Sequence, residues 1–68
     1  MAHERRLLLR GEHEGAGWFT VSYSDRPAHS MENGSHESFV AGLIAQGWSK
    51  IGSTMDKEAW TEDYALAV

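Results

Sequence analysis

The spacing of the apolar residues changes twice along this chain, from a period of two to the spacing of a helix and then back to a strand pattern. In segment 18–24, apolar and polar side chains alternate, which is the pattern of a strand buried on one face. In segment 39–44, apolar residues recur at helical spacing and form one stripe. A chain of 68 residues that carries both patterns is expected to fold as one small α+β domain, spanning residues 1–68.

Four strands and one helix are expected from these patterns. The helix of about 11 residues begins near Ser35 and ends before Gly47. The expected strands are Arg5–Glu12, Trp18–Ser24, Trp48–Met55 and Ala59–Val68. The predicted fold is therefore an antiparallel four-stranded sheet with one helix packed on one face, in the order β-β-α-β-β. The polar stretch Ser24–Ser35, which holds the only proline, is expected to be a loop.

Local signals support these boundaries. Glu14–Gly17 provides turn residues between the first two strands. Ser35 is suited to cap the helix, and Gly47 is suited to end it in the left-handed conformation. Glu62 falls on the apolar side of the last strand, which predicts a twist or a bulge there.

The expected core is formed by apolar residues of the strands and the helix. They are Leu7, Leu9, Phe19, Val21, Tyr23, Phe39, Val40, Leu43, Ile44, Ile51, Leu66 and Val68. This leaves Trp18, Trp48 and Trp60 near the edges or on the second sheet face. Because one helix covers only one face, apolar groups on the other face need a cover, and we predict a homodimer.

Composition excludes several classes of protein. The chain has no cysteine, so it forms no disulfide and no thiolate metal site. Its formal net charge of −4 argues against a broadly basic nucleic-acid-binding domain. The longest apolar run near the start, Leu7–Leu9, is shorter than a secretory or membrane-spanning segment. We therefore expect a cytoplasmic protein, of a bacterium or of an infected host cell, without membrane contact.

Catalytic and metal-binding motifs are not convincing in this sequence. Glu12-His13-Glu14 has metal-ligating residue types, but on a strand the histidine points away from the two carboxylates. His29-Ser30, near Asp25, lacks the strand-turn-helix context of a nucleophilic serine. The glycines match no phosphate-binding loop. We predict a protein that is not an enzyme and has no cofactor and no metal site.

Charge is distributed unevenly along the chain. Residues 1–10 carry a local formal charge of +2, and residues 56–63 carry −3. If the first and last strands lie in separate regions, the molecule has a polar axis. Acidic side chains would then steer a basic protein partner, such as a nuclease, towards aromatic anchors. The predicted partner-binding residues are Glu58, Glu62 and Asp63 as steering charges, with Trp18, Trp60 and Tyr64 as anchors.

Two short stretches are similar to known small domains. Segment 17–25, followed by Pro27 and by Gly34-Ser35-His36-Glu37 at a helix start, resembles the HicB-like antitoxin domain of toxin–antitoxin pairs. The similarity covers roughly Leu7 to Ile44 and implies a protein that masks a toxin ribonuclease. The chain lacks the DNA-binding tail and the second loop proline of that family, and its final hairpin is longer. The joint at segment 43–48 resembles small uncharacterised bacterial and phage domains, and this implies no function.

The sequence therefore predicts a small non-catalytic module that binds a protein, as an inhibitor or antitoxin-like protein does, and masks a basic surface. The alternative is a homodimeric domain that binds a small ligand or nucleic acid through its open sheet face. Arg5, Arg6 and Arg10 near Trp18 would serve nucleic acid in that alternative, although the net charge opposes it. A structural subunit of a larger assembly is a third reading.

Overall fold

A computed structural model describes residues 3–12 and 17–67 of the chain. In these ranges one antiparallel sheet of five strands is accompanied by one α-helix. The strands are β1 (Glu4–Glu12), β2 (Trp18–Tyr23), β3 (His29–Glu32), β4 (Ser49–Met55) and β5 (Ala59–Ala67). A single 3₁₀ turn, η1 (Asn33–Ser35), leads into the helix α1 (His36–Ala45). The spatial order of the strands is β3-β2-β1-β5-β4.

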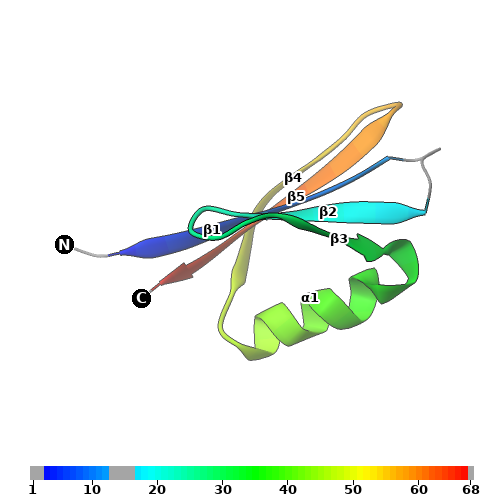
Figure 1. Ribbon diagram of the computed structural model, residues 1–68. Coiled ribbons are helices and arrows are strands. Elements are labelled where there is room, and N and C mark those ends of the chain that lie inside the picture. Colours follow the sequence, from blue (N-terminus) through cyan, green and yellow to red (C-terminus); the bar gives the residue numbers. More distant parts are fainter. Residues whose placement is uncertain (1–2, 13–16, 68) are drawn as a thin grey trace.

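The helix lies on one side of the twisted sheet, and no described element covers the other side (Figure 1). Strands β1 and β5 form the centre and pair along their whole length, from Glu4 opposite Ala67 to Glu12 opposite Ala59. The start of β1 and the end of β5 therefore lie together at one end of the sheet. The β4–β5 turn lies at the other end (Figure 1).

The predicted four-stranded order β-β-α-β-β is wrong, because the sheet has five strands. The missed strand is β3, which lies inside the stretch Ser24–Ser35 that was expected to be a loop. Its four residues pair with β2, with Met31 opposite Phe19. As an edge strand β3 buries little, and its polar composition therefore lacks the apolar alternation that signals a strand. The described fold is a five-stranded antiparallel sheet with one short helix on one face.

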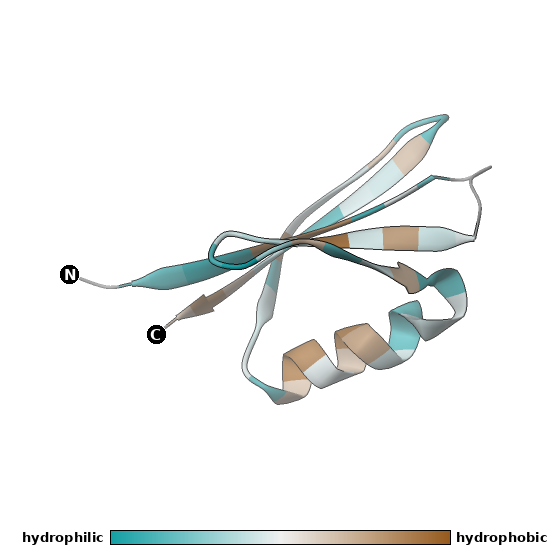
Figure 2. Ribbon diagram, viewed as in Figure 1, coloured by the Kyte–Doolittle hydropathy of each residue, from teal (hydrophilic) through white to brown (hydrophobic). Residues whose placement is uncertain are grey.

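The core lies between α1 and the middle of the sheet. The strongly hydrophobic residues of β1, β2 and α1 gather there, while the start of β1 is hydrophilic (Figure 2). The buried cluster consists of Leu7, Leu9, Phe19, Val21, Leu43, Trp48 and Tyr64. Tyr23, Phe39, Val40 and Leu66 pack partly buried against it, as do Met31 and Trp60.

Three expectations about the core need correction. Ile44 is 53% exposed because the helix turns its last apolar position away from the sheet, and Ile51 is 49% exposed at a bulge of the edge strand β4. Trp48, expected near an edge or on the second face, is instead buried. Val68 and residues 13–16, where a turn was expected from the sequence, lie outside the described residues.

The expected cap at the start of the helix is not formed, whereas the expected glycine ending is. Ser35 has helical dihedral angles and makes no side-chain capping bond. Instead, η1 provides the start, because the His36 N–H donates to the Asn33 carbonyl. At the other end Gly47 has φ +99°, and the Gly47 and Trp48 N–H groups donate to the Ile44 and Leu43 carbonyls, which is a Schellman ending. No helix within the described ranges has the length and apolar character to cross a bilayer.

A glycine in the central strand makes room for an aromatic ring. Gly11 pairs with Trp60 across β1 and β5, and a Cβ atom at Gly11 would lie 2.5 Å from the Trp60 indole. The indole therefore lies over the Gly11 backbone. From there it reaches Phe19 and His36, with ring centroids 6.1 Å and 5.1 Å away. Gly11 is thus required by packing between two strands.

We predict that Gly11→Ala lowers the free energy of unfolding by about 1–3 kcal/mol, because the new methyl group must displace the Trp60 ring. Chemical denaturation followed by circular dichroism measures this. Gly42→Ala is the matched control, since a Cβ atom there meets nothing within 4 Å. In the helix interior this control should stabilise the protein by about 1 kcal/mol. Equal effects of both changes would contradict the packing role of Gly11.

Candidate interaction surface

The two faces of the sheet differ in chemistry. The register of β1 places Leu7, Leu9 and Gly11 on the face covered by α1. The side chains between them point to the uncovered face, which we call the open face. Most open-face positions of the five strands are polar or alanine. The apolar second face that motivated the homodimer prediction is therefore absent from the described strands.

The predicted partner-binding residues divide between the two faces. Trp18 and Asp63 belong to the open face, and Glu58 lies in the turn before β5. Trp18 is 51% exposed and stands opposite Glu32 across β2 and β3. Asp63 stands opposite Leu8 in β1 and forms no ion pair with the described residues.

The other three lie on the covered face. Tyr64 is buried in the core, and Trp60 is half-buried over Gly11. The Glu62 side chain is only 17% exposed. These positions follow from the unbroken pairing of β5 with β1, so the expected irregularity near Glu62 is not there. The shift in register occurs instead in β4, between Lys50 and Gly52.

Acidic residues lie on both strands that flank the exposed Trp18, and a third follows at the same end of the sheet. Glu32 is the cross-strand partner of Trp18. Glu12 follows Gly11, which pairs with Phe19, so Glu12 and Trp18 share the open face at the same end of the sheet. Glu58 immediately precedes Ala59, the partner of Glu12 in β5. We call Trp18, Glu12, Glu32 and Glu58 the acidic end of the open face.

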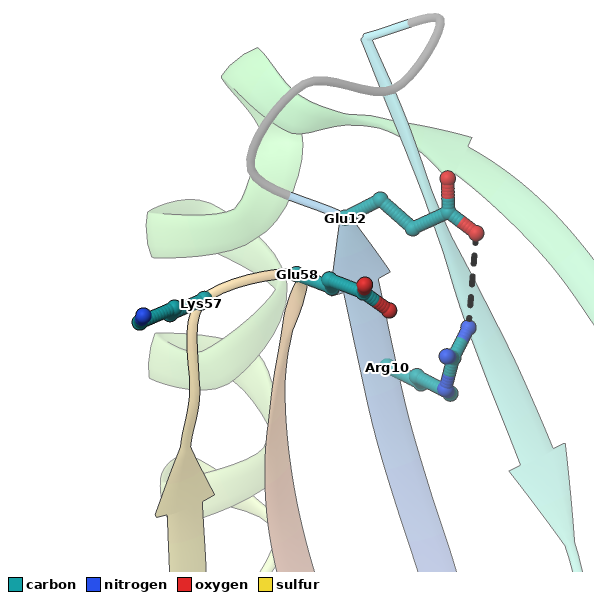
Figure 3. A pocket seen from close by; sticks show the side chains of 4 residues that line it. All are labelled: Arg10, Glu12, Lys57 and Glu58. Atoms are coloured by element: carbon teal, nitrogen blue, oxygen red, sulfur yellow. Dashed lines mark ion pairs between the residues drawn. The ribbon is translucent and has the colours of Figure 1, made fainter.

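A shallow hollow lies at this acidic end. It has a volume of about 260 Å³ and is lined by Arg10, Glu12, Lys57 and Glu58. Figure 3 shows the Glu12 and Glu58 carboxylates on the same side as Arg10, while the Lys57 side chain points away. Arg10 Nη1 lies 3.6 Å from Glu12 Oε1, and both side chains are more than half exposed. The Glu58 carboxylate has no ion-pair partner in the described ranges.

Most cations of the protein are already paired within the chain. The pairs are Arg5 and Arg26 with Asp25, Arg6 with Glu4, Arg10 with Glu12, and Lys50 with Glu62. The Arg5–Asp25 hydrogen bond, with the charges of Arg5 and Arg26, lowers the pKa of Asp25 despite some desolvation. Glu32, Glu37, Glu58 and Asp63 have no such pair among the described residues. The acidic excess is therefore carried by surface groups.

The predicted polar axis was expected between the first and last strands, but in the structure the charge difference has another direction. The first and last strands are not in separate regions, because β1 and β5 are paired neighbours. Antiparallel pairing nevertheless places Arg5 and Arg6 at one end of the sheet. Glu12 and the β4–β5 turn lie at the other. The charge difference thus runs along the strands.

Polar side chains meet on the covered face around Glu62. His36 Nε2 lies 2.7 Å from Glu62 Oε1, Lys50 Nζ donates to Oε2 at 3.4 Å, and Tyr64 Oη donates to Oε1 at 3.3 Å. The His36 ring also packs edge-on against Phe19 and Trp60. These contacts connect the first turn of α1 with β4 and β5. The sequence did not indicate this cluster, because nothing local relates His36 to Glu62.

The surroundings of Glu62 change the acidity of two groups. Partial burial acts to raise the pKa of Glu62. The hydrogen bond and charge of His36, together with Lys50, outweigh burial and lower this pKa below its ordinary value. Burial, with the nearby Glu62 charge, raises the pKa of Tyr64 to about 12. Glu62 is therefore an ionised structural group that its partners hold in place.

No family model, curated protein or solved structure matches the chain. The resemblance to HicB-like antitoxin domains therefore stays a prediction.

We predict that Glu62→Gln lowers the free energy of unfolding at neutral pH by about 1 kcal/mol, because it removes charge-assisted hydrogen bonds. The lowered pKa of Glu62 stabilises the fold above its unfolded pKa of about 4.3, and this contribution is lost as the pH falls through the folded value. The difference between variant and wild type should therefore shrink in acid. Denaturant titrations from neutral to acidic pH measure it, with Glu37→Gln as the control. A constant difference would contradict the assignment.

The buried phenol predicts a second pH dependence. Because the pKa of Tyr64 rises from 10.0 to about 12 on folding, the fold should lose stability as the pH increases between these values. Tyr64→Phe should not show this alkaline loss, although it costs about 1 kcal/mol at neutral pH through the lost hydrogen bond. Phenolate absorbance and unfolding titrations in alkaline buffer test both statements. A wild-type Tyr64 that ionises near pH 10 while folded would refute them.

Proposed function

We propose that this chain is a small, non-catalytic module that binds a basic protein partner through the acidic end of its open sheet face. The observation that carries this proposal is the half-exposed Trp18, which lies between Glu12 of β1 and Glu32 of β3, with Glu58 beyond Glu12 at the same end of the sheet. An exposed tryptophan is a frequent anchor of protein interfaces. The carboxylates at this end of the sheet favour lysine and arginine side chains of a partner.

The charges of the rest of the surface support the same partner class. Arg5, Arg6 and Arg26 are paired within the chain, so they offer little free charge to phosphate groups. Glu32 and Glu58, which have no ion-pair partner in the described part of the chain, add to an overall charge of −4. A partner with a positive groove, such as a nuclease, would be attracted from a distance and masked on contact. We place this activity in the cytoplasm.

Of the residues predicted from sequence to contact the partner, Trp18 and Glu58 carry the proposal, and Asp63 lies on the open face opposite Leu8, outside the acidic end. Trp60, Glu62 and Tyr64 face the helix and act through the fold. The resemblance to HicB-like antitoxin domains agrees with a protein that masks a toxin ribonuclease. The open face also offers a second hollow of about 240 Å³ near Arg6, Leu8 and Asp63. A small-ligand or nucleic-acid role would use this open face too.

The test compares the partner captured by the wild-type chain with that captured by surface variants. We expect Trp18→Ala to weaken binding by about 2 kcal/mol, as loss of an anchor does. Glu58→Lys should slow association at low salt by roughly tenfold and leave dissociation less affected. Affinity capture from lysate with quantitative mass spectrometry identifies the partner, and surface plasmon resonance gives the two rates.

Glu37→Lys is the matched control, because it makes the same charge change on the exposed side of α1. It should leave association nearly as fast as in the wild type. Equal slowing by Glu37→Lys and Glu58→Lys would refute a site at the acidic end. Capture of nucleic acid instead of protein, with affinity that falls steeply with salt, would favour the alternative function.

A further inference from the structure

The sheet has one long edge that no described strand covers. β4 is the last strand in the order β3-β2-β1-β5-β4, and its outer backbone groups face away from β5 along Ser49–Met55. An edge of this kind is a template for pairing with another strand. The opposite edge, β3, has only four residues and carries Glu32, so it is less suited to such pairing.

β4 has little of the charge that usually protects an edge. Its one charged residue is Lys50, whose amine is bound to Glu62 of the same chain. The remainder of the strand is neutral. Two copies that each carry a net charge of −4 can therefore approach along β4 without bringing free charges of like sign together. Elsewhere the acidic excess opposes self-association.

Large apolar side chains are exposed on this strand. Among the described residues, four large hydrophobic side chains are conspicuously exposed, and two of them, Ile51 and Met55, belong to β4. Met55 is 78% exposed, and Ile51 occupies the bulge that shifts the register of β4 against β5. Neither contributes to the core of its own chain. Their positions on an open edge favour a surface that becomes buried.

We propose that two copies of this chain associate by antiparallel pairing of their β4 edges around a two-fold axis at Ser53. In this register Gly52 of each copy faces Thr54 of the other. Ile51 of each copy faces Met55 of the other, so each exposed apolar side chain gains an apolar neighbour. The strand is self-complementary at this register, and the two sheets become one. This interaction is independent of the proposed function, which uses the open face.

The pairing predicts a concentration-dependent equilibrium, because five residues of each copy form only a small interface. Sedimentation velocity over a wide concentration range should show a shift towards twice the chain mass of 7.6 kDa. The chain contains no cysteine, so Ser53→Cys introduces a single thiol at the axis. A short bismaleimide should crosslink this variant.

Ser49→Cys is the matched control on the same strand. In the proposed register its two thiols are separated by roughly 25 Å, beyond a short crosslinker. Efficient crosslinking of Ser53→Cys but not of Ser49→Cys supports the axis. Equal crosslinking of both variants, or a monomer at every concentration, overturns the proposal.

Charge substitution tests the register itself. Ile51→Glu and Met55→Lys should each abolish the dimer, whereas the double variant Ile51→Glu/Met55→Lys should restore it by facing glutamate with lysine. Both side chains are exposed, so folding is retained, as circular dichroism will verify. Ile44→Glu, which changes an exposed side chain of α1, should leave the dimer intact. A double variant that stays monomeric overturns this register.

Discussion

Glu62 has the position of a core residue and the chemistry of a surface residue. The unbroken pairing of β1 with β5 places its carboxylate on the covered face, where an unpaired charge would be costly. His36 from the helix, Lys50 from the edge strand and Tyr64 from the same strand provide its partners. Removing the carboxylate would therefore loosen the helix, the edge and the centre of the sheet together.

The sequence was informative wherever a side chain is strongly apolar and regularly spaced. Strands β1, β2 and β5 and the helix were predicted within one or two residues, because each contributes alternating or helical apolar positions. The bounds of β4 were predicted as closely, although most of its residues are exposed and only Ile51 and Met55 are large and apolar. β3 was missed because a short edge strand buries little and needs no apolar pattern. Its existence depends on pairing with β2, which is a tertiary relation.

The candidate site was less predictable for the same reason. Trp18 and Glu58 were identified from residue type, but their grouping with Glu12 and Glu32 depends on register between strands. Glu62 was interpreted as a steering charge because nothing near it in sequence indicates His36 as a partner. The need for glycine at position 11 was also not predictable, because it depends on the Trp60 ring that packs over it from the neighbouring strand. Local patterns predict elements, whereas contacts between distant strands decide which charges remain free.

The pairing of the first strand with the last also has a consequence for how the chain folds. Glu4 lies opposite Ala67, so the centre of the sheet joins residues separated by nearly the full sequence. Closing a loop of this size costs conformational entropy before any central contact is gained. The topology thus has high contact order, and we expect slower folding than in a helical chain of equal length. During synthesis on the ribosome, β1 and β2 can pair early. The other edge of β1 stays unpaired until β5 has emerged.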